Sequence, residues 1–105
     1  MLVKNFFEEI PSSLPREFIE EIYSSQNFRM ERIISEGHSS PEGFWYDQNK
    51  NEFVILLRGS AILAFEDEPS IHLKPGDYLV IPAHKKHRVE QTDLSQKTFW
   101  LTLYF

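Results

Sequence analysis

Residues 52–87 decide the fold of this chain, and they read EFVILLRGSAILAFEDEPSIHLKPGDYLVIPAHKKH. The apolar runs 53–57, 61–65 and 78–81 are separated by short segments rich in glycine, proline, serine and aspartate. β-Branched and aromatic residues favour strands, whereas glycine and proline favour the tight turns that join them. Short strands that follow one another this closely predict an all-β sandwich or barrel.

The chain on both sides of this stretch continues the pattern of short strands. Further β-prone runs lie at 29–34, 44–46, 71–73 and 88–92. The last run, Thr98–Phe105, has only apolar side chains on one face and a mixed set on the other. This alternation predicts a strand with one face in a core and the other lining a cleft or an interface.

The segment before residue 28 has a different period. Its apolar residues recur at helical spacing, namely Leu14, Phe18, Ile19 and Ile22. We therefore predict a short amphipathic helix over Leu14–Tyr23 that covers an open side or end of the barrel. At 105 residues the length suits one domain overall, with a helical lead-in over 1–27 and a β-barrel over 28–105.

The composition suits a single packed core and narrows the function. Hydrophobic residues make up 41% of the chain and charged residues 26%, which is typical of a soluble domain. The net charge of -5 argues against a nucleic-acid partner, because phosphate binding needs a positive face. The basic cluster 85–88 is the local exception, and we interpret it as the solvated rim of a loop.

The sequence lacks cysteine, a secretory signal and a long apolar run. The chain has no cysteine, so disulfides and thiolate metal sites are excluded. Met1–Ile10 lacks the pattern of a secretory signal, and no run of about 18 apolar residues occurs. We therefore expect a cytoplasmic protein without a membrane partner.

Five residues of the central stretch carry a family resemblance. Glu52, Gly59, Gly76, Pro82 and His87 have the order and spacing of the paired motifs of the cupin superfamily. The runs GFWYDQ at 43–48, IPAH at 81–84 and HRVE at 87–90 resemble a group of small bacterial cupin-domain proteins. The resemblance implies an antiparallel β-barrel, a double-stranded β-helix or jelly roll, with a ligand or metal pocket inside.

The metal pattern of that superfamily is kept only in part. It consists of a pair of histidines, a glutamate a few residues later and a final histidine in the second block. Glu52 matches the glutamate and His87 the final histidine, while Tyr46 and Gln48 stand where the paired histidines would be. With a longer spacing the equivalents are Trp45 and Asp47 instead, so the sequence leaves open whether Asp47 or Gln48 faces the pocket.

The resemblance implies a divalent metal site, with zinc, iron, manganese or nickel as candidates. Its candidate ligands are Gln48, Glu52, His84 and His87. Replacing two imidazoles by an amide and a phenol shifts the site toward weaker, harder coordination. His84 lies on a loop, where a turn after Pro82 would bring it to His87; the alternative is a rim histidine bonded to the backbone.

Two classes of function follow for the pocket. In the first, the protein is a metal-dependent enzyme acting on a small molecule, such as a dioxygenase, isomerase or lyase, in which Glu52 or His84 moves a proton. In the second, it is a non-catalytic module that binds or senses a small ligand without a metal. We also expect a homodimer, because the apolar N-terminal segment and the strand Thr98–Phe105 offer surfaces that need cover.

Overall fold

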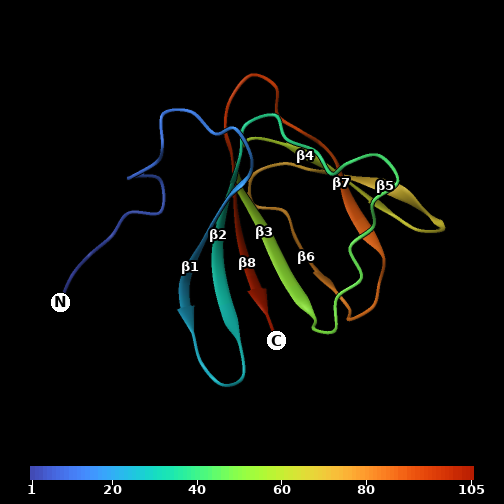
Figure 1. Ribbon diagram of the computed structural model, residues 1–105, viewed down its shortest axis with the longest axis horizontal. Helices are drawn as coiled ribbons and strands as arrows, with labels where there is room; N and C mark the ends of the chain where they lie inside the picture. The colour runs from blue at the N-terminus through green and yellow to red at the C-terminus, as the bar shows by residue number, and fades with distance from the viewer.

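The computed structural model describes all residues from 1 to 105, and they form two antiparallel sheets without a helix (Figure 1). The larger sheet has five strands in the order β1-β2-β8-β3-β6, and the smaller has three in the order β5-β4-β7. The strands are β1 (Phe18–Ser24), β2 (Arg29–Ser35), β3 (Glu52–Arg58), β4 (Ala61–Phe65), β5 (Glu68–Leu73), β6 (Tyr78–Ile81), β7 (His87–Thr92) and β8 (Thr98–Tyr104). The predicted all-β antiparallel architecture is confirmed.

The main core lies between the two sheets. Alternate residues of β3 and β4 point into it, as the period of a strand requires. Its buried residues are Val54, Leu56, Ala61, Leu63, Phe65, Leu73, Ile81 and Trp100. Because the smaller sheet has fewer strands, it faces only part of the larger one, and β1 and β2 extend beyond it (Figure 1).

The strand β8 shows the alternation that its sequence predicts, but the face that points into the core is the mixed one and not the purely apolar one. Its mixed face, which includes Trp100 and Thr102, is buried toward the interior. Its purely apolar face lies on the outside of the larger sheet, where Leu101 and Leu103 remain half-buried. On that face only Phe99 is buried, and the N-terminal segment covers it.

The predicted helix over Leu14–Tyr23 is wrong, because this segment contains the strand β1. Phe18 and Ile19 lie on opposite faces: Phe18 packs beside Ile34, whereas Ile19 lines the interior. Pairing with β2 satisfies the backbone, and a bulge near Glu21 shifts the register. Apolar residues that serve both faces of a bulged strand can imitate the period of a helix.

The lead-in before β1 packs on the outer face of the larger sheet. Phe6, Phe7 and Leu14 join the small cluster around Ile34 and Phe99. Arg32, which is buried, donates hydrogen bonds to the carbonyls of Phe6 and Glu8, both at 2.8 Å. In contrast, Met1, Leu2 and Val3 are fully exposed. The structure has no helix that could cross a membrane.

Candidate functional site

A cavity of about 100 Å³ lies between the two sheets. Its apolar wall consists of Ile19, Ile33, Val54, Leu63, Ile81, Val89 and Trp100. Its polar wall includes Tyr46, Gln48, Glu52, His87, Thr102 and Tyr104. A mostly apolar pocket with a few convergent polar groups is the usual form of a small-molecule site.

Glu52 and His87 form the polar centre of this cavity. Both are more than nine-tenths buried, and Nε2 of His87 lies 3.5 Å from Oε1 of Glu52. Nδ1 of His87 lies 2.9 Å from the carbonyl oxygen of Lys85. Since a carbonyl can only accept, Nδ1 carries a proton and donates it there, which turns Nε2 toward Glu52.

The pKa of His87 results from opposing effects. Burial lowers this pKa because it penalises the imidazolium. The hydrogen bonds with Glu52 and the Lys85 carbonyl, together with the charge of Glu52, outweigh burial and raise the pKa above its ordinary value. The carboxylate of Glu52 therefore favours the protonated form of the buried His87 imidazole.

The loop before β3 fixes the imidazole from one side. An isolated bridge joins Tyr46 to His87, with backbone N–H···O distances of 2.7 and 3.2 Å. The ring of Tyr46 stacks on that of His87 with a centroid distance of 5.6 Å, and Phe65 lies on His87 at 6.2 Å. Burial, followed by the charges of Glu17 and Glu52, raises the pKa of Tyr46.

The structure decides between the two alignments that the sequence leaves open. Tyr46 and Gln48 line the cavity, whereas Trp45 and Asp47 do not. Asp47 instead turns to the rim, where its Oδ1 lies 2.8 Å from Nδ1 of His84. Of Asp47 and Gln48, Gln48 is therefore the residue that faces the cavity in which the Glu52–His87 pair lies.

His84 is not brought to the pair. Its side chain is 68% exposed, and its backbone has a φ of +65° in the loop after β6. It lines a separate polar hollow at the rim, together with Arg29, Asp47 and Lys50. Of the predicted ligands, the structure groups Gln48, Glu52 and His87 in the cavity and leaves His84 outside.

Three further residues of the cavity were not singled out from the sequence. Thr102 and Tyr104 lie on the mixed face of β8, whose alternation already indicated a cleft. Glu17 precedes β1, inside the segment predicted to be helical; its Oε2 accepts a hydrogen bond of 2.8 Å from the hydroxyl of Ser35. That hydroxyl accepts a bond of 3.1 Å from the indole of Trp100.

The donor set fits a weak metal site and does not fit a tight one. No group of three or more histidine, cysteine, aspartate or glutamate side chains stands close enough to hold an ion. Catalytic zinc sites use three protein ligands, and here Glu52 and His87 supply two, with the amide oxygen of Gln48 as a third, harder donor. The His87–Lys85 bond is of the kind that orients metal-binding imidazoles.

Comparison with known proteins identifies the family. The Cupin domain family matches residues 31–104, which include both sheets apart from β1 and the first residues of β2. The chain belongs to the cupin family. No curated protein matches it.

Solved structures of other cupins share the fold. A protein from Ralstonia eutropha, named "putative mannose-6-phosphate isomerase", is 37% identical, with a TM-score of 0.94 over 99% of this chain and 97% of that one. An RmlC-like cupin from Desulfovibrio desulfuricans is 20% identical, with a TM-score of 0.75 over 99% and 96%. An RmlC-like cupin with a double-stranded β-helix fold from Methanocaldococcus jannaschii is 17% identical, with a TM-score of 0.70 over 99% and 91%. The last two likenesses concern the fold alone.

Proposed function

We propose that this cupin binds a compact hydroxycarbonyl compound in its cavity and that Glu52 and His87 isomerise it by proton transfer. The observation that carries the proposal is the buried pair on the cavity wall, with Nε2 and Oε1 3.5 Å apart. A carboxylate and an imidazolium held side by side supply a base and an acid to one bound molecule. Both side chains are buried, and the low dielectric of a buried site strengthens the interactions of Glu52 and His87 with a bound substrate.

The chemical step needs only these two groups. The carboxylate of Glu52 removes the proton from the carbon that bears the hydroxyl, while the His87 imidazolium protonates the carbonyl oxygen. The product is an enediol, with a neutral carboxyl and a neutral imidazole. The carboxyl then returns its proton to the former carbonyl carbon, and the imidazole takes the proton of the other hydroxyl. The carbonyl has moved by one carbon, and both residues are restored.

The size of the cavity indicates a short substrate. At about 100 Å³ it lies well below the roughly 300–1,000 Å³ of pockets that hold drug-sized ligands. The name of the Ralstonia eutropha protein supports isomerase chemistry, but a hexose phosphate would extend far beyond this cavity. A three-carbon sugar therefore suits the site better, and dihydroxyacetone and glyceraldehyde are the probes of choice.

Proton exchange in D₂O tests the proposal. Each triose, and mannose 6-phosphate in parallel, is incubated with the protein, and ¹H NMR follows the protons on the carbons next to the carbonyl. We expect exchange and interconversion of the trioses. Glu52→Gln and His87→Asn should each lower the rate about 100-fold or more, the usual contribution of general acid–base catalysis.

Asp47→Asn is the matched control, because its carboxylate contacts His84 outside the cavity. This variant should keep the rate within about twofold, since a surface change has only a small effect. Binding of the trioses without exchange above the buffer rate would contradict catalysis and support the non-catalytic binding module. Exchange of mannose 6-phosphate alone would contradict the size argument.

A second candidate function includes a divalent metal ion held by Gln48, Glu52 and His87. The observation that favours it is the anchoring of Nδ1 of His87 to the Lys85 carbonyl, which turns Nε2 toward Glu52 on the cavity wall. A bound metal would supply Lewis-acid polarisation of a substrate oxygen. Elemental analysis after incubation with zinc, iron, manganese or nickel should find metal in the native protein and in Asp47→Asn. Glu52→Ala and His87→Ala should retain none, and a metal-free native protein would contradict this candidate.

A further inference from the structure

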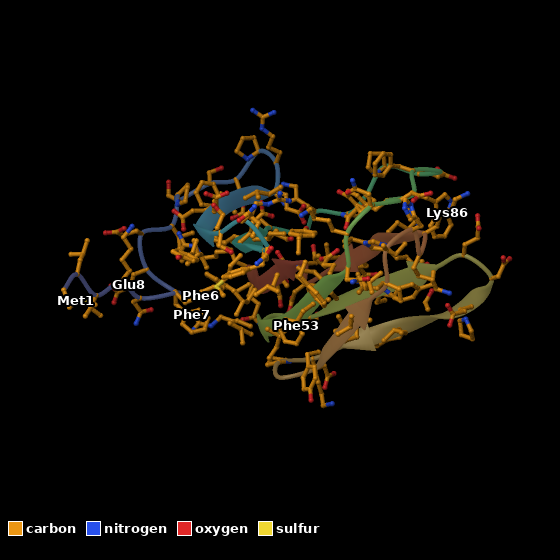
Figure 2. All side chains as sticks on the ribbon, turned by 90° about the horizontal axis from the view of Figure 1, so that it is seen from below. Met1, Phe6, Phe7, Glu8, Phe53 and Lys86 are labelled. Carbon is orange, nitrogen blue, oxygen red and sulfur yellow. The ribbon has the colours of Figure 1, made fainter.

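Glu17 brings a second carboxylate to the cavity, from a part of the chain that lies before the residues matched to the Cupin domain family. Phe18, the first residue of β1, packs on the outer face of the larger sheet. The residue before it faces inward, and the register of β1 with β2 puts Glu17 opposite Ser35. The lead-in is anchored, because its Phe6 and Phe7 lie against the sheets (Figure 2) and pack in the same outer cluster as Phe18.

One oxygen of the Glu17 carboxylate is fixed, and the other has no partner. The buried hydroxyl of Ser35 donates a hydrogen bond of 2.8 Å to Oε2 of Glu17 and accepts one of 3.1 Å from the indole of Trp100. Nothing else in the chain bonds to this carboxylate, and none of the ion pairs includes it. Its Oε1 can therefore accept a hydrogen bond from a bound molecule.

Glu17 and the Glu52–His87 pair are two separate polar places on the wall of one cavity. The three side chains do not come close enough together to hold a single ion. Both carboxylates nevertheless face the same space, since after burial the charges of Glu17 and Glu52 are the effects that raise the pKa of Tyr46 on the cavity wall. A ligand that fills a cavity of about 100 Å³ therefore contacts both places.

We propose that Glu17 binds a hydroxyl of the substrate while the Glu52–His87 pair acts on the carbonyl end, and that the charge of Glu17 keeps phosphorylated compounds out. This role rests on the proposed function and names its substrate class, which is neutral trioses with a hydroxyl at the end that does not react. The cavity wall has two carboxylates, one imidazole and no lysine or arginine. A phosphate would meet like charges at low dielectric, where their repulsion is strongest.

Two ligands that differ by one hydroxyl test the contact. Titration followed by ¹H NMR gives the dissociation constants of dihydroxyacetone and of hydroxyacetone, which lacks the second hydroxyl. The native protein should bind dihydroxyacetone about tenfold more tightly, because hydroxyacetone leaves the Glu17 carboxylate unpaired. Glu17→Ala should bind the two ligands equally, since a methyl group accepts no hydrogen bond. A purely structural role would instead weaken both alike and leave their ratio unchanged.

Glu17→Gln separates the hydrogen bond from the charge. The amide of glutamine can still bond to a hydroxyl, so this variant should keep the preference for dihydroxyacetone. It should bind dihydroxyacetone phosphate about tenfold more tightly than the native protein does, because one of two like charges is gone. Glu21→Gln is the matched control, since Glu21 is exposed on β1 and lies outside the cavity. The control should change none of these dissociation constants.

Equal binding of dihydroxyacetone and hydroxyacetone by the native protein would overturn the contact with Glu17. Tighter native binding of dihydroxyacetone phosphate than of dihydroxyacetone would overturn the exclusion of phosphate. Circular dichroism checks the β fold of each variant, and Glu17→Gln, which can keep the bond to Ser35, tests the charge even where Glu17→Ala does not fold. The expected preference without proton exchange in D₂O would contradict the isomerisation and still support this role of Glu17. No binding of dihydroxyacetone at all would overturn both.

Discussion

His87 reaches Glu52 from the opposite sheet, so that one ion pair joins β7 and β3 inside the molecule with Nε2 and Oε1 3.5 Å apart. Burying two charges is costly unless they are paired and hydrogen-bonded. Here the Lys85 carbonyl accepts a hydrogen bond from the other ring nitrogen of His87, Nδ1. The pair therefore links the stability of the barrel to the protonation of its cavity.

The first prediction concerns the pKa of His87 in metal-free protein. Burial opposes protonation, and the bond with Glu52 is the largest effect that raises the pKa. Glu52→Gln should therefore lower it, which NMR titration of the imidazole would measure. An unchanged pKa would contradict the pairing. Asp47→Asn is the control and should leave it unchanged.

The same pairing gives stability a pH dependence. Because the pKa of His87 is raised in the folded state, its contribution is fully present below the ordinary value of about 6.5 and is lost as the pH rises through the folded pKa. Glu52→Gln should cost about 1–3 kcal/mol at a pH of about 5.5. The cost should shrink as the pH rises through the folded pKa, because His87 is then neutral in the folded and in the unfolded protein.

Much of the fold could be predicted because local signals agreed with the tertiary structure. The strands β3 and β4 alternate buried and half-buried residues as their sequences indicate, and Gly59 turns the chain between them with φ +89°. Glu52 and His87 were recognised because each begins a strand at a family-like position. Their proximity depends on the packing of two sheets.

The misses have physical reasons. The apolar spacing predicted a helix where β1 lies, because the bulge near Glu21 breaks the period of that strand. Asp47 and Gln48 could not be told apart, since a shift of one residue exchanges the two faces of an extended chain. For His84 the sequence left a cavity ligand and a rim histidine open, and the contact with Asp47 places its side chain at the rim. Only long-range packing decides these cases.

A second prediction compares two glycines of positive φ. A Cβ at Gly59 would lie 2.4 Å from Oγ1 and 2.8 Å from Cα of Thr98, whereas a Cβ at Gly76 would meet nothing within 4 Å. Gly76→Ala should therefore lower the free energy of unfolding by about 1–2 kcal/mol, from backbone strain alone. Gly59→Ala should lower it by about 2–5 kcal/mol, since overpacking adds to the strain. Equal losses in urea unfolding would contradict the close approach to Thr98.

A third prediction concerns the turn before β6. Asp77 accepts a hydrogen bond of 2.9 Å from the backbone N–H of Lys74, and this bond, with the Lys74 side chain, lowers the pKa of its carboxyl. Its contribution to stability is present above the ordinary pKa of about 3.9 and is lost as the pH falls through the lowered value. Asp77→Asn should thus lower the melting temperature at neutral pH, with a smaller difference near a pH of about 2. The exposed Glu42→Gln should show no such pattern.

The last prediction contrasts two buried threonines. Thr92 donates a bond of 2.6 Å to the carbonyl of His38, whereas Oγ1 of Thr102, on the cavity wall, has no partner. Thr92→Val should cost about 1–2 kcal/mol in the free energy of unfolding, because it leaves a carbonyl unpaired. Thr102→Val should instead raise that free energy by about 1 kcal/mol, since it removes an unsatisfied polar group and keeps the shape of the side chain.

The Thr102→Val substitution that raises stability should weaken the binding of a ligand in the cavity. An unpartnered hydroxyl on the cavity wall is a group that a bound molecule can satisfy, so Thr102→Val should weaken dihydroxyacetone binding, followed by NMR line broadening, by about tenfold, the effect of about 1.4 kcal/mol. Thr102→Ser keeps the hydroxyl and should retain binding. A Thr102→Val protein that is less stable than the native one and binds dihydroxyacetone equally well would show that the hydroxyl has a structural partner, because only a group satisfied within the chain loses stability on removal without a change in binding.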